Sequence, residues 1–139
     1  MGKKIKVVFD TNVWISIAME KVLKDEFSQV KQELIIYVSD DIILEISKVL
    51  LYPKIAEILK QIGITEKEIL WASVANCRMI EPKVKLGVIN EDAEDNKILE
   101  CALASGADII VSGDRHLLKL GKFKKTRIVT PREFFDNFT

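Results

Sequence analysis

The sequence has few of the residues that build disulfide frameworks or zinc sites, and neither sign of charge is in excess. Its 139 residues include two cysteines, one histidine, 21 basic and 21 acidic side chains. Cys77 and Cys101 lie among apolar residues without metal-binding spacing, so we expect buried free thiols rather than a disulfide. A net charge of zero argues against a protein that coats nucleic acid non-specifically, but it does not exclude a local binding site.

Long apolar runs and low-complexity segments are missing as well. No stretch approaches the roughly 20 apolar residues that cross a bilayer, and Asp10 comes too early for a signal peptide. Nothing is rich in proline or serine, which argues against a long linker. We therefore expect a single domain over residues 1–139, located in the cytoplasm and without membrane contact.

Short apolar runs alternate with amphipathic segments along the whole chain. The runs predict strands at residues 5–9, 33–39, 77–82, 107–114 and 126–130. Helical spacing is predicted for residues 13–34, for two helices that meet near Pro53, for residues 65–76 and 96–106, and for a short helix plus turn over residues 116–123. Continuous apolar strands separated by helices are typical of a parallel sheet covered on both faces. The fold class we predict is α/β, a three-layer α/β/α sandwich.

Local signals support the helix boundaries. Thr65 with Glu68, and Thr130 with Glu133, have the spacing of a capping box, in which side chain and backbone cap each other. Gly106 is placed to end the helix before it.

Two acids stand directly after predicted strands. Asp10 follows residues 5–9, and Asp114 follows the last strand-forming valine and serine behind a glycine. The carboxyl ends of parallel strands meet at one edge of a sheet, where ligands bind, so we expect both acids there. Two neighbouring carboxylates repel each other, and a hard divalent cation with oxygen ligands relieves the repulsion. The alternative for each is a helix N-cap, a stronger alternative for Asp114 than for Asp10.

Two further acids are candidates for the same site. Glu45 lies inside an apolar helix face, although it could also point to solvent between apolar stripes. Asp41, one turn earlier, is a weaker competitor. Asp95 is expected at the start of a helix, where the helix dipole by itself favours an acid. Asp92 could assist Asp95 or substitute for it.

Basic residues are concentrated near the end of the chain. Residues 115–132 hold seven lysines and arginines and no acid. Arg115 is placed to meet a phosphate at the rim of the site, with a solvated loop as the alternative. We expect a rim or capping role for His116 rather than general base catalysis, and core or dimer contacts for Trp14 and Trp71.

Several segments together resemble a known family. They read VVFDTNVWIS, LEISKVL, EDAEDNKILECALASGADIIVSGDRHLL and IVTPREFF. In order and spacing the chain resembles, over nearly its whole length, the PIN-domain nucleases, which include the VapC-like toxins of toxin–antitoxin pairs. The resemblance implies a flavodoxin-like parallel sheet with strand order of about 3-2-1-4-5.

The resemblance also implies a site of four acids. Their positions here are Asp10, Glu45, Asp95 and Asp114, as catalytic residues and metal ligands, with Thr11, Asn12, Asp92 and Ser112 in secondary roles. Relatives often read Asp-Pro-x-Asp where this chain has Asp-Ala-Glu-Asp, which leaves the choice between Asp92 and Asp95 open; we favour Asp95. One or two Mg²⁺ or Mn²⁺ ions would be held there, and a pair of ions would lie about 3.5–4 Å apart.

The implied function is metal-dependent endonucleolytic cleavage of RNA. A toxin would also have a small antitoxin protein as partner and would form a homodimer or a higher oligomer. The alternatives are a stand-alone RNA-processing nuclease and a PIN scaffold that binds RNA or protein without catalysis. A phosphohydrolase of the haloacid-dehalogenase type ranks lower, because Asn12 stands where that mechanism needs a second aspartate.

Overall fold

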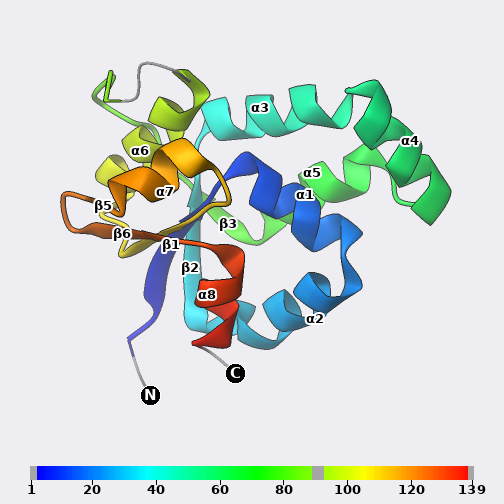
Figure 1. Ribbon diagram of the computed structural model, residues 1–139, viewed down its shortest axis with the longest axis horizontal. Helices are drawn as coiled ribbons and strands as arrows, with labels where there is room; N and C mark the ends of the chain where they lie inside the picture. Colours follow the sequence, from blue (N-terminus) through cyan, green and yellow to red (C-terminus); the bar gives the residue numbers. More distant parts are fainter. Residues whose placement is uncertain (1–2, 89–92, 138–139) are drawn as a thin grey trace.

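A mostly parallel six-stranded sheet organises the protein (Figure 1). The computed structural model describes residues 3–88 and 93–137. The strand order is β3-β2-β1-β4-β6-β5, and only the pairing of β5 with β6 is antiparallel. The strands are β1 (Ile5–Phe9), β2 (Leu34–Val38), β3 (Cys77–Met79), β4 (Ile109–Val111), β5 (Lys122–Phe123) and β6 (Thr126–Val129).

The sheet confirms the predicted class and order, and it adds one strand. The five predicted strands occur in the order expected; β1 has the predicted bounds, and the other four are shorter. The prediction of only a helix and a turn up to residue 123 was wrong, because Lys122 and Phe123 form an edge strand. Lys124, at a φ of 52°, reverses the chain so that Phe123 pairs with Thr126. A positive φ in a two-residue connection is what a tight hairpin requires.

Helices connect the strands and cover both faces of the sheet. They are α1 (Thr11–Met19), α2 (Lys21–Val30), α3 (Asp40–Leu50), α4 (Pro53–Ile62), α5 (Glu66–Ala75), α6 (Ala93–Ser105), α7 (Arg115–Leu120) and α8 (Pro131–Asp136), with a 3₁₀ turn at Lys31–Glu33. Val8 and Phe9 point to opposite faces of the sheet, yet both are 0% exposed. Both faces are therefore covered, as continuous apolar strands predict.

The helix boundaries follow the local signals more closely than the periodicity. Both capping boxes form, at Thr65 and at Thr130, and Gly106 has the positive φ of a helix stop. The single helical segment predicted for residues 13–34 was wrong: it divides at Glu20, and Leu34 already belongs to β2. The helix α6 begins at Ala93, three residues before the predicted start at 96.

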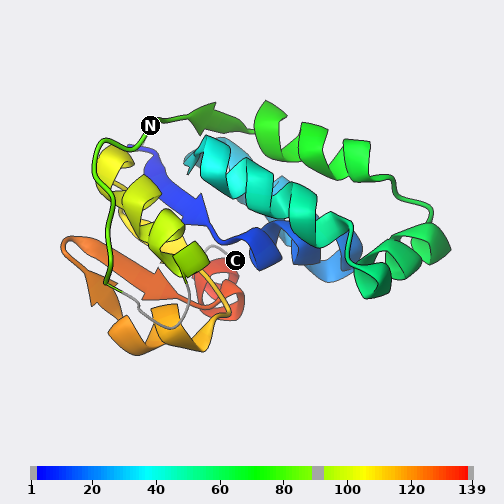
Figure 2. The ribbon, with the colours of Figure 1, turned by 90° about the horizontal axis from the view of Figure 1, so that it is seen from above.

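The helices α3, α4 and α5 extend to one side of the sheet, with α4 farthest from it (Figures 1 and 2). Among the described residues, no helix is both long and apolar enough to span a bilayer. Both cysteines are free thiols, as predicted, with Cys101 buried and Cys77 half-buried. Burial raises the pKa of each thiol to about 12, which makes them poor nucleophiles.

An aromatic cluster packs around the last residue of β1. Phe9 makes edge-to-face contacts with Trp14, Phe27 and Phe134 at ring-centre distances of 5.1, 5.9 and 5.9 Å. Trp14 is 3% exposed and belongs to the core, as expected, whereas Trp71 is 72% exposed on α5. The cluster ties α1, α2 and α8 to β1, the strand that leads to Asp10.

We expect Phe134→Ala to lower the free energy of unfolding by about 3–5 kcal/mol, because it leaves a cavity beneath β1. Urea denaturation followed by circular dichroism measures the change. The matched control is Trp71→Ala, an exposed aromatic that should cost far less. Equal losses in the two variants would contradict the supporting role of α8.

Candidate metal centre

The pairing of β1 with β4 brings the first and last predicted acids together. Phe9 is the register partner of Val111, and the backbone N–H of Asp10 donates to the Val111 carbonyl at 3.0 Å. Asp10 and Ser112 therefore leave the same edge of the sheet side by side. Asp114 follows two residues later, at the N-cap of α7.

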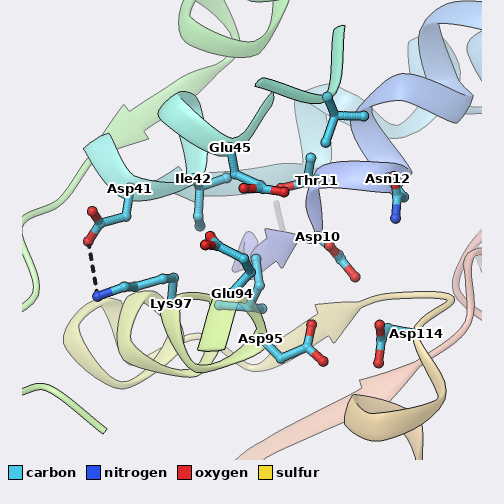
Figure 3. A pocket seen from close by; sticks show the side chains of 12 residues that line it. Asp10, Thr11, Asn12, Asp41, Ile42, Glu45, Glu94, Asp95, Lys97 and Asp114 are labelled. Carbon is cyan, nitrogen blue, oxygen red and sulfur yellow. Dashed lines mark ion pairs between the residues drawn. The ribbon is translucent and has the colours of Figure 1, made fainter. Parts of the chain in front are cut away.

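All four predicted acids line one cavity of about 70 Å³. Asp10 comes from the end of β1, Glu45 from α3, Asp95 from α6 and Asp114 from the turn after β4. Figure 3 shows the carboxylates of Asp10, Asp95 and Asp114 directed toward one shared space. The cavity is also lined by Thr11, Asn12, Asp41, Ile42, Val49, Glu94, Lys97 and Ile98.

Ser112 connects two of the acids. Its hydroxyl donates to Oδ2 of Asp10 at 2.6 Å and accepts the backbone N–H of Asp114 at 2.9 Å. The side chain is 0% exposed, so water does not compete for these bonds. Ser112 therefore fixes the Asp10 carboxylate and the backbone that carries Asp114.

Asp10 is held where a negative charge is costly. It stands at the N-cap position of α1, but its side chain makes no capping hydrogen bond there, contrary to the N-cap alternative. Burial raises the pKa of Asp10 above its ordinary value, the bond from Ser112 lowers it, and the charge of Asp114 raises it again. The backbone amides of Asn12 and Thr11 also lower the pKa, and the net shift is upward. A cation in the cavity would offset the cost of ionising this carboxyl group.

Asp114 combines both of the roles considered for it. Its Oδ1 accepts the backbone N–H of His116 at 2.8 Å, so it does cap α7. The same carboxylate is partly exposed and lines the cavity, where it raises the pKa of Asp10. The capping bond thus orients the acid toward the site.

The packing of α3 on α6 brings further acids to the cavity. Glu45 is half-buried and faces the cavity, and Asp95 is 5% exposed. Asp41, considered only a weak competitor, also lines the cavity. Its Oδ2 lies 3.9 Å from Nζ of Lys97, which is 3.7 Å from Oε1 of the buried Glu100.

Sequence reasoning did not select Lys97 or Glu94 as site residues, and it placed His116 at the rim. Glu94 and Lys97 stand on either side of Asp95 in α6, but only the packing of α6 against α3 shows that they face the cavity. Nδ1 of His116 lies 3.6 Å from Oδ1 of Asp114 and 3.8 Å from Oδ2 of Asp95. The imidazole is 30% exposed and lies beside two of the acids, which is compatible with the expected position at the rim.

Arg115 is exposed on α7 and is not among the lining residues. Asp92 lies outside the described residues, so its assignment stays a prediction.

The donor set fits a divalent cation of the Mg²⁺ or Mn²⁺ kind. Carboxylate oxygens from two helices, one strand end and one turn converge on a small polar cavity, and such hard oxygen ligands suit hard cations. The fold and the site together define an α/β protein with an acidic candidate metal centre at the carboxyl edge of a parallel sheet.

Comparison with known proteins gives the family. Residues 6–116 match the model of the PIN domain, and the chain belongs to the PIN-domain family. It is 34% identical over 149 aligned positions to the uncharacterized protein MJ1680 of Methanocaldococcus jannaschii, covering 97% of this chain and 92% of the relative. The fold is similar to a chain in the crystal structure of VapBC2 from Rickettsia felis bound to a DNA fragment from their promoter. That match has a TM-score of 0.60 and 14% identity, and it covers 91% of this chain and 98% of the other.

We expect Asp10→Asn to stabilise the metal-free protein at neutral pH, by about 1 kcal/mol or more, because it removes a costly buried carboxyl group. A raised pKa means that this cost is absent below the ordinary pKa of 3.8, grows as the pH rises toward the raised value, and is complete above it. The stabilisation should therefore shrink as the pH falls toward 4. Thermal unfolding in EDTA across this range measures it.

Asp25→Asn on the exposed surface of α2 is the matched control. It should change the unfolding temperature little and without this pH trend. A destabilised Asp10→Asn protein at neutral pH in EDTA would contradict the account of Asp10.

Proposed function

We propose that this protein is a metal-dependent endoribonuclease that hydrolyses RNA phosphodiester bonds at its four-acid cavity. The observation that supports the proposal most is the convergence of Asp10, Glu45, Asp95 and Asp114, from four separate segments, on a single cavity. Membership of the PIN-domain family supports a nuclease.

Each acid has a role that its position suggests. Asp10 and Asp114 act as central ligands, while Glu45 and Asp95 complete the coordination directly or through water. One or two bound Mg²⁺ or Mn²⁺ ions would supply an activated water and stabilise the charge on the phosphate. Ser112 keeps Asp10 and the Asp114 backbone in place, and the backbone amides of Thr11 and Asn12 lower the pKa of Asp10.

We propose a toxin with a small antitoxin as its partner, and this proposal draws on the similarity in fold to a chain of the VapBC2 complex. A homodimer or higher oligomer is proposed with it. Large apolar side chains exposed on and between α3, α4 and α5 support a protein contact there: Leu44, Leu51, Tyr52, Trp71 and Val74. Co-purification with the product of the adjacent gene distinguishes a toxin from a stand-alone RNA-processing enzyme.

We expect the wild type to cut a mixture of structured and unstructured RNA with Mg²⁺ or Mn²⁺, and not in EDTA. Asp10→Asn should reduce the rate by about 100-fold or more, since even residues that only support metal ligands contribute 10–100-fold. Asp25→Asn makes the same chemical change outside the cavity and should keep full activity. Gel analysis of end-labelled RNA follows the cleavage.

Three outcomes are separated by this comparison. Cutting that survives in Asp10→Asn would mean a contaminant or a misplaced site. No cutting of any RNA by folded wild type would favour the non-catalytic PIN scaffold. Metal-dependent cutting that only Asp10→Asn abolishes supports the proposal.

We also expect charge reversal at Lys122, Lys124 and Lys125 to weaken RNA binding and to flatten its dependence on salt, because lysine–phosphate contacts release counterions. All three are exposed near the end of α7. Reversal of the exposed lysines Lys54, Lys60 and Lys67, on α4 and α5, is a control of equal charge. Filter binding at several salt concentrations measures both, and equal salt slopes in the two triple variants would contradict this expectation.

A further inference from the structure

We propose that His116 supplies a nitrogen ligand to the metal centre and makes it favour Mn²⁺ over Mg²⁺. The inference rests on the proposed metal-dependent function and goes beyond the four-acid site, which contains oxygen ligands only. It starts from one cluster: Asp95, Asp114 and His116 each offer a ligand atom, and these atoms lie within 4.8 Å of one another.

The distances are too long for hydrogen bonds and leave room for a shared ion. Nδ1 of His116 lies 3.6 and 3.8 Å from the nearest carboxylate oxygens of Asp114 and Asp95, beyond hydrogen-bonding range. Two atoms bound to one ion at about 2.1 Å can be at most about 4.2 Å apart. Both distances to Nδ1 fall below that limit, so one ion can bind the imidazole and either carboxylate together.

The surroundings of Nδ1 also favour a bound cation. This nitrogen is buried and has no hydrogen-bond partner among the described residues. A neutral imidazole that turns its lone pair toward two carboxylates is repelled by them, and a buried N–H without an acceptor is costly. A metal ion between the nitrogen and the oxygens removes both problems.

The backbone fixes the imidazole in this place. The N–H of His116 donates to Oδ1 of Asp114, and the neighbouring Leu117 is 0% exposed and anchors α7 in the core. The side chain of His116 is 30% exposed, so an ion can reach the site from solvent. The histidine is therefore held beside the acid that the site needs.

A nitrogen ligand changes the choice of metal. Mg²⁺ prefers oxygen ligands in an octahedral arrangement, whereas imidazole binds first-row transition metals more strongly. Carboxylates with one imidazole still suit Mn²⁺. The cluster of Asp95, Asp114 and His116 is thus a site for Mn²⁺ in preference to Mg²⁺.

The test is pulsed electron paramagnetic resonance of the Mn²⁺-loaded protein, purified without a histidine tag. A directly bound imidazole nitrogen gives a ¹⁴N modulation, and the chain has a single histidine, so this signal reports His116 alone. Isothermal titration gives the affinities for Mn²⁺ and Mg²⁺ separately. Neither readout depends on RNA cleavage.

Two variants sharpen the result. His116→Phe keeps a ring but removes the nitrogen, so the ¹⁴N modulation should disappear and the preference for Mn²⁺ over Mg²⁺ should fall about tenfold. His116→Asn places an amide oxygen near the position of Nδ1 and should recover Mg²⁺ binding more than Mn²⁺ binding. Thermal unfolding of both variants in EDTA checks that they fold.

The outcomes separate this inference from the proposed function. Saturable Mn²⁺ binding that Asp10→Asn weakens, with ¹⁴N modulation only in the wild type, supports both. The same binding without ¹⁴N modulation, or with an unchanged metal preference in His116→Phe, overturns the role of His116 and leaves the metal centre standing. No saturable Mn²⁺ binding by the folded wild type overturns both.

Discussion

The register between β1 and β4 is the constraint on which the rest of the site depends. Phe9 pairs with Val111, so the next residue on each strand, Asp10 and Ser112, leave the sheet together. Their side chains are joined by a 2.6 Å hydrogen bond although they are 102 residues apart in sequence. A slip of one residue would turn the Asp10 side chain to the opposite face of the sheet and break this contact. The parallel pairing therefore decides whether the acids of the candidate metal centre meet at all.

The packing of the rest of the molecule maintains this register, although the register brings together acids that repel each other. Burial makes a charge on Asp10 costly, and Asp114 adds to the cost. The ring contacts of Phe9 with Trp14, Phe27 and Phe134 hold β1 in place. Of the three helices that supply these rings, only α1 also lines the cavity. The packing of the core thus supports a group of acids that would separate if each were free to move. Among the described residues, Lys97 is the only basic side chain that lines the cavity. His116 is the only one in the cluster with Asp95 and Asp114.

The fold could be predicted from the sequence wherever a feature depends on residues that are close together in the chain. The capping boxes at Thr65 and Thr130 formed as predicted, because each depends on residues three positions apart. The strand at residues 122–123 could not be predicted in this way, since Lys122 and Phe123 pair only with the edge that β6 presents. The break at Glu20 was missed because apolar spacing continued across it, although Val22 is 66% exposed.

The sequence alone predicted that Asp10, Glu45, Asp95 and Asp114 share one site, through the strand ends and the family resemblance, although it did not select Asp41 or Glu94, which also line the cavity. It also determined the class of the fold, since continuous apolar strands must be covered on both faces. Only the tertiary structure decided which side chains contact these acids. The Ser112 hydroxyl donates to Asp10 at the ends of two neighbouring strands. Lys97 on α6 lies near Asp41 on α3, and the ring of His116 faces Asp95. These contacts join segments far apart in the chain, and local sequence patterns carry no information about the distances between such segments.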